Sequence, residues 1–138
     1  MKNTTTLVLS EKESITYTDG ADRKPTYQLG NGQDYFFIKK NSMFTKVPLN
    51  DILWVAALGD YVTIHTKDQR FILHITFKSI EDKLPPSKFV RVHRSYIVQL
   101  DTIRVVDDAT IFIHNASMPI PIGPLYKKNF IGRLNPLG

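Results

Sequence analysis

The chain has 138 residues, of which 42% are apolar and none is cysteine. This length suits one compact domain with a modest core, and the lack of cysteine excludes disulfides and thiolate chemistry. No apolar run approaches the roughly 20 residues of a membrane span, and no signal-peptide pattern follows Met1, so we expect a cytoplasmic protein with no membrane partner.

The formal net charge of +5 is concentrated in the second half of the chain. Residues 87–138 carry seven basic and three acidic side chains, whereas residues 1–34 carry four basic and five acidic ones. A basic surplus attracts polyanions by long-range steering but does not identify the polyanion. Ordinary solubility charge is the alternative explanation for a surplus of this size, so charge alone leaves the partner open.

Residues 1–34 are rich in Thr, Ser, Gly and charged side chains and lack sustained apolar periodicity, which indicates an N-terminal extension or linker. From residue 35 the pattern changes to short runs rich in Val, Ile, Phe and Tyr, which favour strands. The sequence therefore predicts one all-β or β-dominated domain over residues 35–138. Turns are expected at Gly59-Asp60 and Lys67-Asp68, so residues 61–75 form the clearest hairpin candidate.

Two short helices interrupt the predicted strands. Thr76 is a capping residue, the apolar residues Phe77, Ile80 and Leu84 follow at helical spacing, and Pro85-Pro86 ends this helix of about ten residues. A second helix is expected after Pro124, with a basic face of Lys127, Lys128 and Arg133 and an apolar stripe of Leu125, Tyr126, Phe130, Ile131 and Leu134. Between them lie four strand candidates, Phe89–Val98, Ile103–Val106, Thr110–His114 and Met118–Ile122.

The sequence offers little for catalysis. It contains no phosphate-binding glycine loop, no HExxH and no GxSxG, and no carboxylate lies near His93 and Ser95 to complete a triad. Four histidines, at positions 65, 74, 93 and 114, bind zinc only if strands bring them together, and a small hydrolase is conceivable only in that case. We therefore expect no enzyme activity, cofactor or metal.

The segment Phe89–Val98 is the most unusual in the chain. As one continuous strand it would place Arg91, His93 and Ser95 on one side and Arg94 and Tyr96 on the other, so both sides mix apolar and cationic groups. A half-buried strand separates such groups more cleanly. The arginines therefore either emerge at a strand end or line a surface that binds anions.

At this point the chain resembles a known family. Residues 91–98 are similar to the RvHrSylVN signature of LytTR DNA-binding domains. Residues 52–62 resemble the family stretch "I-x-y-i-E-a-x-g-n-Y-v", and residues 77–89 resemble "L-x-x-l-e-x-x-L-p-x-x-F". Residues 119–128 are similar to the closing "iPvSr-x-y-k" block, so four blocks in the right order cover roughly residues 35–134.

The resemblance implies an elongated arrangement of small antiparallel sheets with two short helices. It implies a bacterial transcriptional regulator, the output domain of a two-component response regulator, that binds double-stranded DNA at promoter direct repeats as a homodimer. Its loops and strand ends would enter successive major grooves. An upstream histidine kinase or receiver domain would then act from outside this chain.

Carried over by position, three places should reach DNA: the loop Leu58–Tyr61, Arg94, and the turn Gly123-Pro124 leading into the following lysines. Arg94 has the sharpest mechanism, because a guanidinium can bond bidentately to guanine O6 and N7. The lysines would hold phosphates without reading sequence, or simply form a solvated face. The expected DNA-binding residues are Gly59, Asp60, Tyr61, Arg91, His93, Arg94, Pro124, Lys127, Lys128, Lys39 and Lys40.

Some of these positions have alternative roles. For His93 the alternatives are a bond to phosphate and a bond that holds the Arg94 loop, and for Tyr61 they are contact with a groove and closure of a hairpin. The chain also departs from the family pattern: Ala56 replaces a carboxylate, Gln99 an Asn, and Gly123-Pro124 a Ser-Arg pair. If the last change removes base readout there, a β-module that binds RNA or a protein is the alternative, although no exposed aromatic pair favours RNA.

Overall fold

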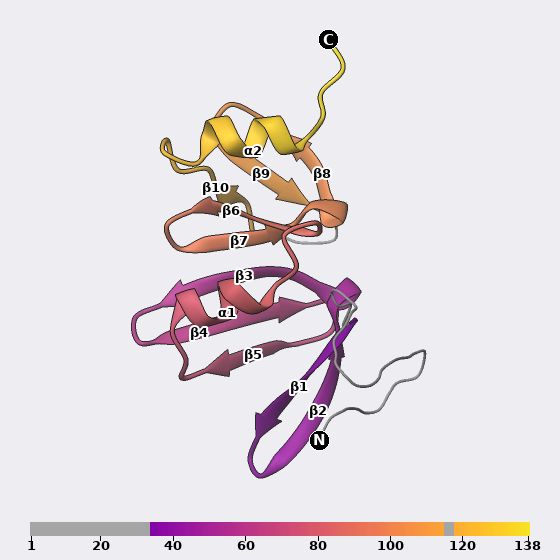
Figure 1. The fold of residues 1–138 in the computed structure, drawn as a ribbon, viewed down its shortest axis with the longest axis vertical. Coiled ribbons are helices and arrows are strands. Elements are labelled where there is room, and N and C mark those ends of the chain that lie inside the picture. The colour runs from indigo at the N-terminus through magenta and orange to yellow at the C-terminus, as the bar shows by residue number, and fades with distance from the viewer. Residues whose placement is uncertain (1–33, 115–117) are drawn as a thin grey trace, which may run out of the picture. The chain divides into compact units, whose positions relative to one another are not determined.

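The computed structural model describes residues 34–114 and 118–138, so the predicted extension at residues 1–34 lies almost wholly outside the described residues (Figure 1). The chain divides into two compact units, one ending at Leu49 and the other running from Asn50 to Gly138. Three small antiparallel sheets and two α-helices make up the described part. This confirms the predicted β-dominated fold with small antiparallel sheets and two short helices.

The first unit contains a hairpin of β1 (Tyr35–Lys40) and β2 (Met43–Pro48). Lys40 pairs with Met43, which leaves a two-residue turn of Asn41 and Ser42. Their φ angles are 53° and 69°, and a tight hairpin turn of this kind needs positive φ at both central residues. The short helix η1 (Leu49–Asp51) then leads into the second unit.

The second unit is built on a five-stranded sheet in the order β5-β4-β3-β7-β6. Its central strand β3 has four consecutive buried residues, Ile52 to Val55, because both of its faces are covered. The predicted hairpin within residues 61–75 is confirmed, since β4 and β5 pair across it. The five strands are β3 (Ile52–Leu58), β4 (Tyr61–Thr66), β5 (Arg70–Leu73), β6 (Phe89–His93) and β7 (Tyr96–Gln99).

The prediction of one strand over Phe89–Val98 is wrong. The chain turns at Arg94 and Ser95, and β6 and β7 pair with each other as a hairpin. The alternation of faces expected beyond His93 therefore does not hold. The pairing is also irregular between Arg91 and His93, where one extra residue is accommodated in β6.

The first helix, α1 (Phe77–Lys83), begins as predicted. Thr76 is its N-cap, and the Thr76 hydroxyl accepts a hydrogen bond of 3.1 Å from the backbone N–H of Ser79. The helix has seven residues, fewer than expected, and ends before Leu84. Ile80 and Leu84 are buried, so this short helix gains its stability from packing rather than from its length.

The remaining strands form a three-stranded sheet in the order β10-β9-β8. Helix η2 (Leu100–Thr102) precedes β8 (Ile103–Val106), which is followed by β9 (Thr110–Ile113) and β10 (Ile120–Pro121). The last helix, α2 (Lys127–Arg133), follows. Predicted strands Thr110–His114 and Met118–Ile122 are thus present but shorter.

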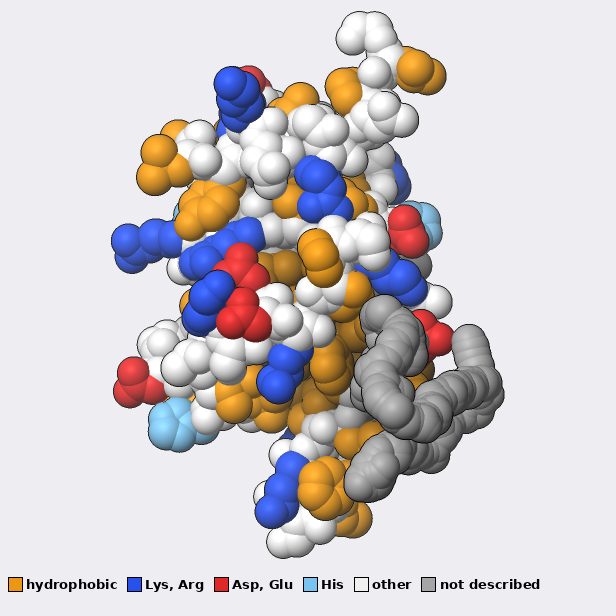
Figure 2. Space-filling view, in the orientation of Figure 1, with side chains coloured by type: hydrophobic (Ala, Val, Ile, Leu, Met, Phe, Trp, Pro, Cys, Tyr) orange, Lys and Arg blue, Asp and Glu red, His pale blue; other side chains and the backbone are white. Residues whose placement is uncertain are grey.

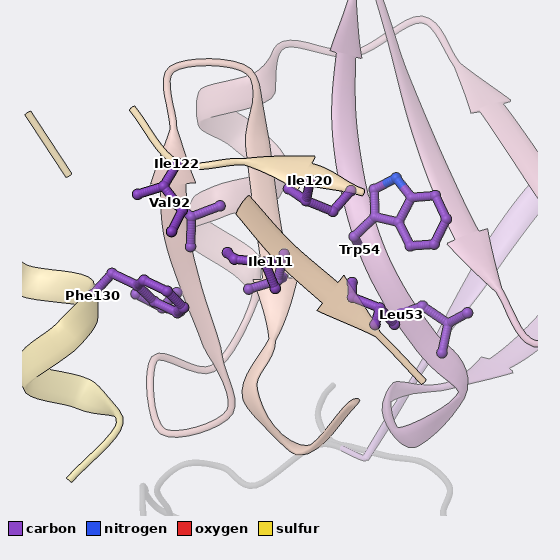
Figure 3. Packing of buried hydrophobic residues seen from close by; sticks show 10 residues of the cluster. Leu53, Trp54, Val92, Ile111, Ile120, Ile122 and Phe130 are labelled. Carbon is purple, nitrogen blue, oxygen red and sulfur yellow. The ribbon is translucent and has the colours of Figure 1, made fainter. Parts of the chain in front are cut away.

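One hydrophobic cluster joins the two sheets of the second unit and α2. Figure 3 shows Phe130 of α2 and Val92 of β6 pointing toward Ile111 of β9, with Trp54 of β3 on the far side of the cluster. Phe130, Val92 and Ile111 are fully buried. The expected apolar stripe of α2 is correct at Phe130 but wrong at Leu125, which is 94% exposed.

Candidate nucleic-acid interface

The pairing of β3 with β4 and β7 brings two predicted DNA-binding loops to one edge of the five-stranded sheet, the edge formed by the ends of its strands. Leu58 pairs with Tyr61 around the Gly59–Asp60 turn, and Ala56 pairs with Tyr96 just after the Arg94–Ser95 turn. In addition, the Ala57 N–H donates to the Ser95 carbonyl at 2.9 Å. Both turns lie at the left of the view in Figure 1.

The third predicted loop, Gly123-Pro124, lies beside the second. The Gly123 N–H donates to the Val92 carbonyl at 2.8 Å, next to His93 at the end of β6. A Cβ atom on Gly123 would lie 3.2 Å from Cδ2 of Tyr126 and 3.4 Å from Cα of His93. A Cβ atom here would therefore be in ordinary contact with His93 and would require the Tyr126 ring to shift by a few tenths of an ångström.

Arg94 is the first residue of the turn between β6 and β7. Its side chain is exposed and makes no hydrogen bond or ion pair with any residue that the structure describes. In the space-filling view, Lys and Arg side chains gather along this edge at the left, with acidic side chains directly below them (Figure 2). The guanidinium of Arg94 is therefore free to meet an anionic or hydrogen-bonding partner.

Arg91 has a different environment, because each of its guanidinium nitrogens is already bonded. Nε donates to the His93 carbonyl at 3.2 Å, Nη2 to the Arg94 carbonyl at 2.5 Å, and Nη1 to Oε1 of Glu81 at 3.1 Å. The same group lies over the rings of Phe77 and Tyr126, 4.8 and 5.5 Å from their centroids.

His93 also bonds within the turn. Its Nδ1 accepts a hydrogen bond of 3.1 Å from the backbone N–H of Ser95, and its ring lies 5.4 Å from that of Tyr96. An Nδ1 that accepts a hydrogen bond carries no proton. This geometry matches the expected role of holding the Arg94 loop, and the other ring nitrogen stays available to an outside partner.

The first turn presents Gly59, Asp60 and Tyr61, and all three are exposed. Gly59 has φ of 59°, a left-handed conformation that favours glycine and closes the turn between β3 and β4. The Tyr61 ring lies 5.1 Å from the ring of His74, which follows β5, and Tyr61 is 47% exposed, so it packs against the protein and is also accessible from outside.

The two lysines that follow the Gly123-Pro124 turn, Lys127 and Lys128, differ in their ion pairing. Nζ of Lys127 lies 2.6 Å from Oδ1 of Asp108, in the turn between β8 and β9. The hydrogen bond from Lys127, followed by its charge, lowers the pKa of the Asp108 carboxyl. Lys128 is exposed and has no ion pair within residues 34–114 and 118–138. Pro124 is exposed beside them.

Lys39 and Lys40 lie on β1 of the first unit, and both are exposed. The Lys39 ammonium lies 6.0 Å from the ring centroid of Phe44, on the paired strand. These two residues belong to a separate unit from the three turns. The three turns on the second unit thus form one candidate surface, and the two hairpin lysines form another.

The histidines do not gather into a metal site among the residues described. His65 is on β4, His93 ends β6, and no group of three or more potential metal ligands occurs in the described ranges. The His65 ring stacks on Trp54 with centroids 4.2 Å apart, and burial followed by the charge of Arg70 lowers its pKa. No helix in the described residues has the length and apolar character for a membrane span.

Sequence reasoning missed the side chains that hold Arg91 and Lys127. Glu81 and Phe77 lie on α1, ten and fourteen positions before Arg91, and Asp108 lies nineteen positions before Lys127. Such partners meet only through the tertiary fold, so no local spacing predicts them. A single acidic residue on an exposed helix face carries no signal of this kind.

A β-dominated scaffold that presents cationic loops along one edge defines a nucleic-acid-binding module. The profile of the family described as the LytTr DNA-binding domain matches residues 42–135. The chain therefore belongs to the LytTr DNA-binding domain family. A solved LytTr DNA-binding domain of a putative methyl-accepting/DNA response regulator from Bacillus cereus has the same fold, with a TM-score of 0.64 and 20% identity over 75% of this chain and 98% of that one.

Curated relatives are longer proteins. The chain is 26% identical to transcriptional regulatory protein YpdB of Escherichia coli K12 over 72% of this chain and 41% of YpdB. It is 29% identical to sensory transduction protein LytT of Bacillus subtilis 168, over 70% of this chain and 42% of LytT. The chain thus spans about two fifths of the length of these relatives.

Proposed function

We propose that this chain binds duplex DNA with sequence preference and regulates transcription. One observation carries the proposal: the turn that holds Arg94, which has no partner within residues 34–114 and 118–138, lies beside the two other predicted loops, Gly59–Tyr61 and Gly123–Lys128, along one edge. The family membership and the curated regulators support the same reading. In this proposal Arg94 reads a base edge in the major groove, and Lys128 contacts phosphate.

The test is a selection of bound sites from random duplexes, followed by binding isotherms on a selected and a scrambled duplex. An Arg94→Ala variant should lose about ten- to hundredfold in the preference for the selected site, the range of one bidentate base contact. Arg70→Ala is the matched control. Arg70 is an exposed arginine in the same sheet, next to the turn at the opposite end of β4, and its loss should leave the preference unchanged.

Two results would contradict the proposal. An equal loss of affinity for both duplexes in Arg94→Ala would place Arg94 on phosphate and remove it from readout. Stronger competition by single-stranded RNA than by duplex DNA would instead favour the alternative β-module that binds RNA.

We further propose that two copies bind a direct repeat in the cytoplasm and that signals reach them from a receiver domain or histidine kinase outside this chain. The relatives named as sensory transduction and regulatory proteins support this arrangement. Sedimentation of the chain with duplexes carrying one or two selected half-sites tests it. Two bound copies are expected only on the duplex with two half-sites.

A further inference from the structure

We propose that Arg91 is a positioning residue that sets the conformation of the Arg94 turn and does not itself contact DNA. The proposal rests on the proposed function, because it assigns Arg91 a role within the same interface. It replaces the direct DNA contact expected for Arg91 from its place in the signature.

Hydrogen bonds from one side chain hold the turn from within. Nε and Nη2 of Arg91 donate to the carbonyls of His93 and Arg94, the two consecutive residues that lead into the turn. Charge-assisted bonds of this kind are stronger than neutral ones. Two parallel donors on a rigid planar group fix the direction of both peptide units, and with them the direction in which Arg94 leaves the backbone.

The guanidinium is in turn held by residues outside the turn. Nη1 of Arg91 pairs with Glu81 of α1 at 3.1 Å, in a pair whose side chains are 27% and 30% exposed. Phe77 of α1 and Tyr126, which precedes α2, lie within cation–π range of it. Arg91 therefore connects α1, the Arg94 turn and the Gly123–Tyr126 segment.

This arrangement uses three of the five N–H donors of Arg91, one on each nitrogen, and leaves its side chain only 27% exposed. Only the two remaining donors could reach DNA, and only without moving a guanidinium that is held through all three of its nitrogens. The backbone hydrogen bonds between β6 and β7 are interrupted between Arg91 and His93, so this part of the hairpin gains from additional side-chain hydrogen bonds. Side-chain bonds from Arg91 and from His93 replace the missing restraint.

The first experiment needs no DNA. Hydrogen exchange of the Ser95 amide reports on opening of the turn, since this N–H is bonded to Nδ1 of His93. Arg91→Lys should speed this exchange by about tenfold or more, because an ammonium cannot serve both carbonyls and Glu81 at once. Glu81→Ala, which keeps both carbonyl bonds, should give a smaller increase. Arg70→Lys is the matched control and should change nothing.

The second experiment measures binding of the full chain to a selected and a scrambled duplex at several salt concentrations. Arg91→Lys and Arg91→Gln should both reduce the preference for the selected duplex toward the level of Arg94→Ala. In Arg91→Gln the slope of log affinity against log salt should stay at the wild-type value, because no phosphate contact is lost. In an Arg94→Ala background, Arg91→Gln should remove little further preference.

Three outcomes would overturn the proposal. One is unchanged Ser95 exchange in Arg91→Lys, and a second is full retention of site preference in that variant. A third is a salt slope that falls by about one in Arg91→Gln, which would indicate a direct phosphate contact. If wild-type chain shows no preference between the duplexes, the proposed function fails, and the exchange experiment alone still decides whether Arg91 positions the turn.

Discussion

Arg91 and Arg94 carry the same guanidinium three positions apart, and their surroundings give them different chemistry. Arg91 is partly buried, and all of its nitrogens are bonded to protein, whereas Arg94 is exposed and has no partner among the described residues. The sequence signature placed both residues among the expected DNA contacts, with Arg94 as the leading candidate. Only the turn between β6 and β7 separates the arginine that holds the backbone from the arginine that faces outward.

Asp108 leads to a prediction about a single residue, because its carboxylate is paired with the ammonium of Lys127. Lys127 holds the Asp108 pKa below its usual value, so the pair persists at neutral pH and is lost only as pH falls through that lowered pKa. Asp108→Asn should therefore strengthen DNA binding at low salt and steepen its salt slope by up to about one, since Lys127 becomes free for phosphate.

Binding isotherms at several salt concentrations on one selected duplex measure this effect. Asp107→Asn is a weaker control, because Asp107 also accepts backbone hydrogen bonds. Asp68→Asn is better matched, since Asp68 is exposed in the turn at the far end of β4. Equal strengthening by both substitutions would indicate a general effect of net charge rather than release of Lys127.

At the scale of elements, Gln99 joins the end of β7 to the beginning of β3. Its side chain is 2% exposed, and Nε2 donates to the Ile52 carbonyl at 2.7 Å. Gln99→Leu keeps the size but removes the donor, so it should lower the free energy of unfolding by about 1–3 kcal/mol. Urea unfolding measures the change, and Gln69→Leu at an exposed turn is the control. A loss of similar size in both variants would contradict this role.

Helix α2 gives a second prediction about elements. Phe130 is fully buried between α2 and the sheets, whereas Leu125, five positions earlier, is 94% exposed. Phe130→Ala should cost about 3–5 kcal/mol of unfolding free energy, the usual cost of emptying a core aromatic site. Leu125→Ala should have almost no effect. Thermal and urea unfolding of both variants check the difference, and a small loss in Phe130→Ala would mean that α2 is not anchored through this ring.

Some helices and turns could be predicted from local sequence, and others could not. Helix α1 was predictable because its cap and its apolar spacing are both local, as were the hairpins closed by Gly59-Asp60 and Lys67-Asp68. The turn at Arg94 and Ser95 was not, since Ser95 is a weaker turn former than Gly, Pro or Asn and the turn depends on bonds from Arg91 and His93. The sequence suggested which loops make up the candidate site, but their approach to one another arises from strand order and has no local signal.

At the scale of the whole molecule, the two units can be tested for separate contributions to one binding event. Lys39 and Lys40 lie on the hairpin unit, and Arg94 lies on the larger one. If the hairpin lysines contact only phosphates, Lys39→Gln with Lys40→Gln should weaken binding equally on selected and scrambled duplexes. The salt slope should fall by up to about two, because each lost contact removes roughly 0.9.

The same substitutions should leave the ranking of sites unchanged, in contrast to Arg94→Ala, which changes the ranking. Salt-dependent isotherms on a small panel of duplexes distinguish the two patterns. Lys67→Gln with Lys83→Gln is a control of equal charge, since both lysines are exposed in the larger unit. If that control lowers the slope as much as the hairpin variant does, the effect belongs to net charge, and the hairpin lysines make no contact of their own. A changed ranking in the hairpin variant would instead assign base readout to the first unit.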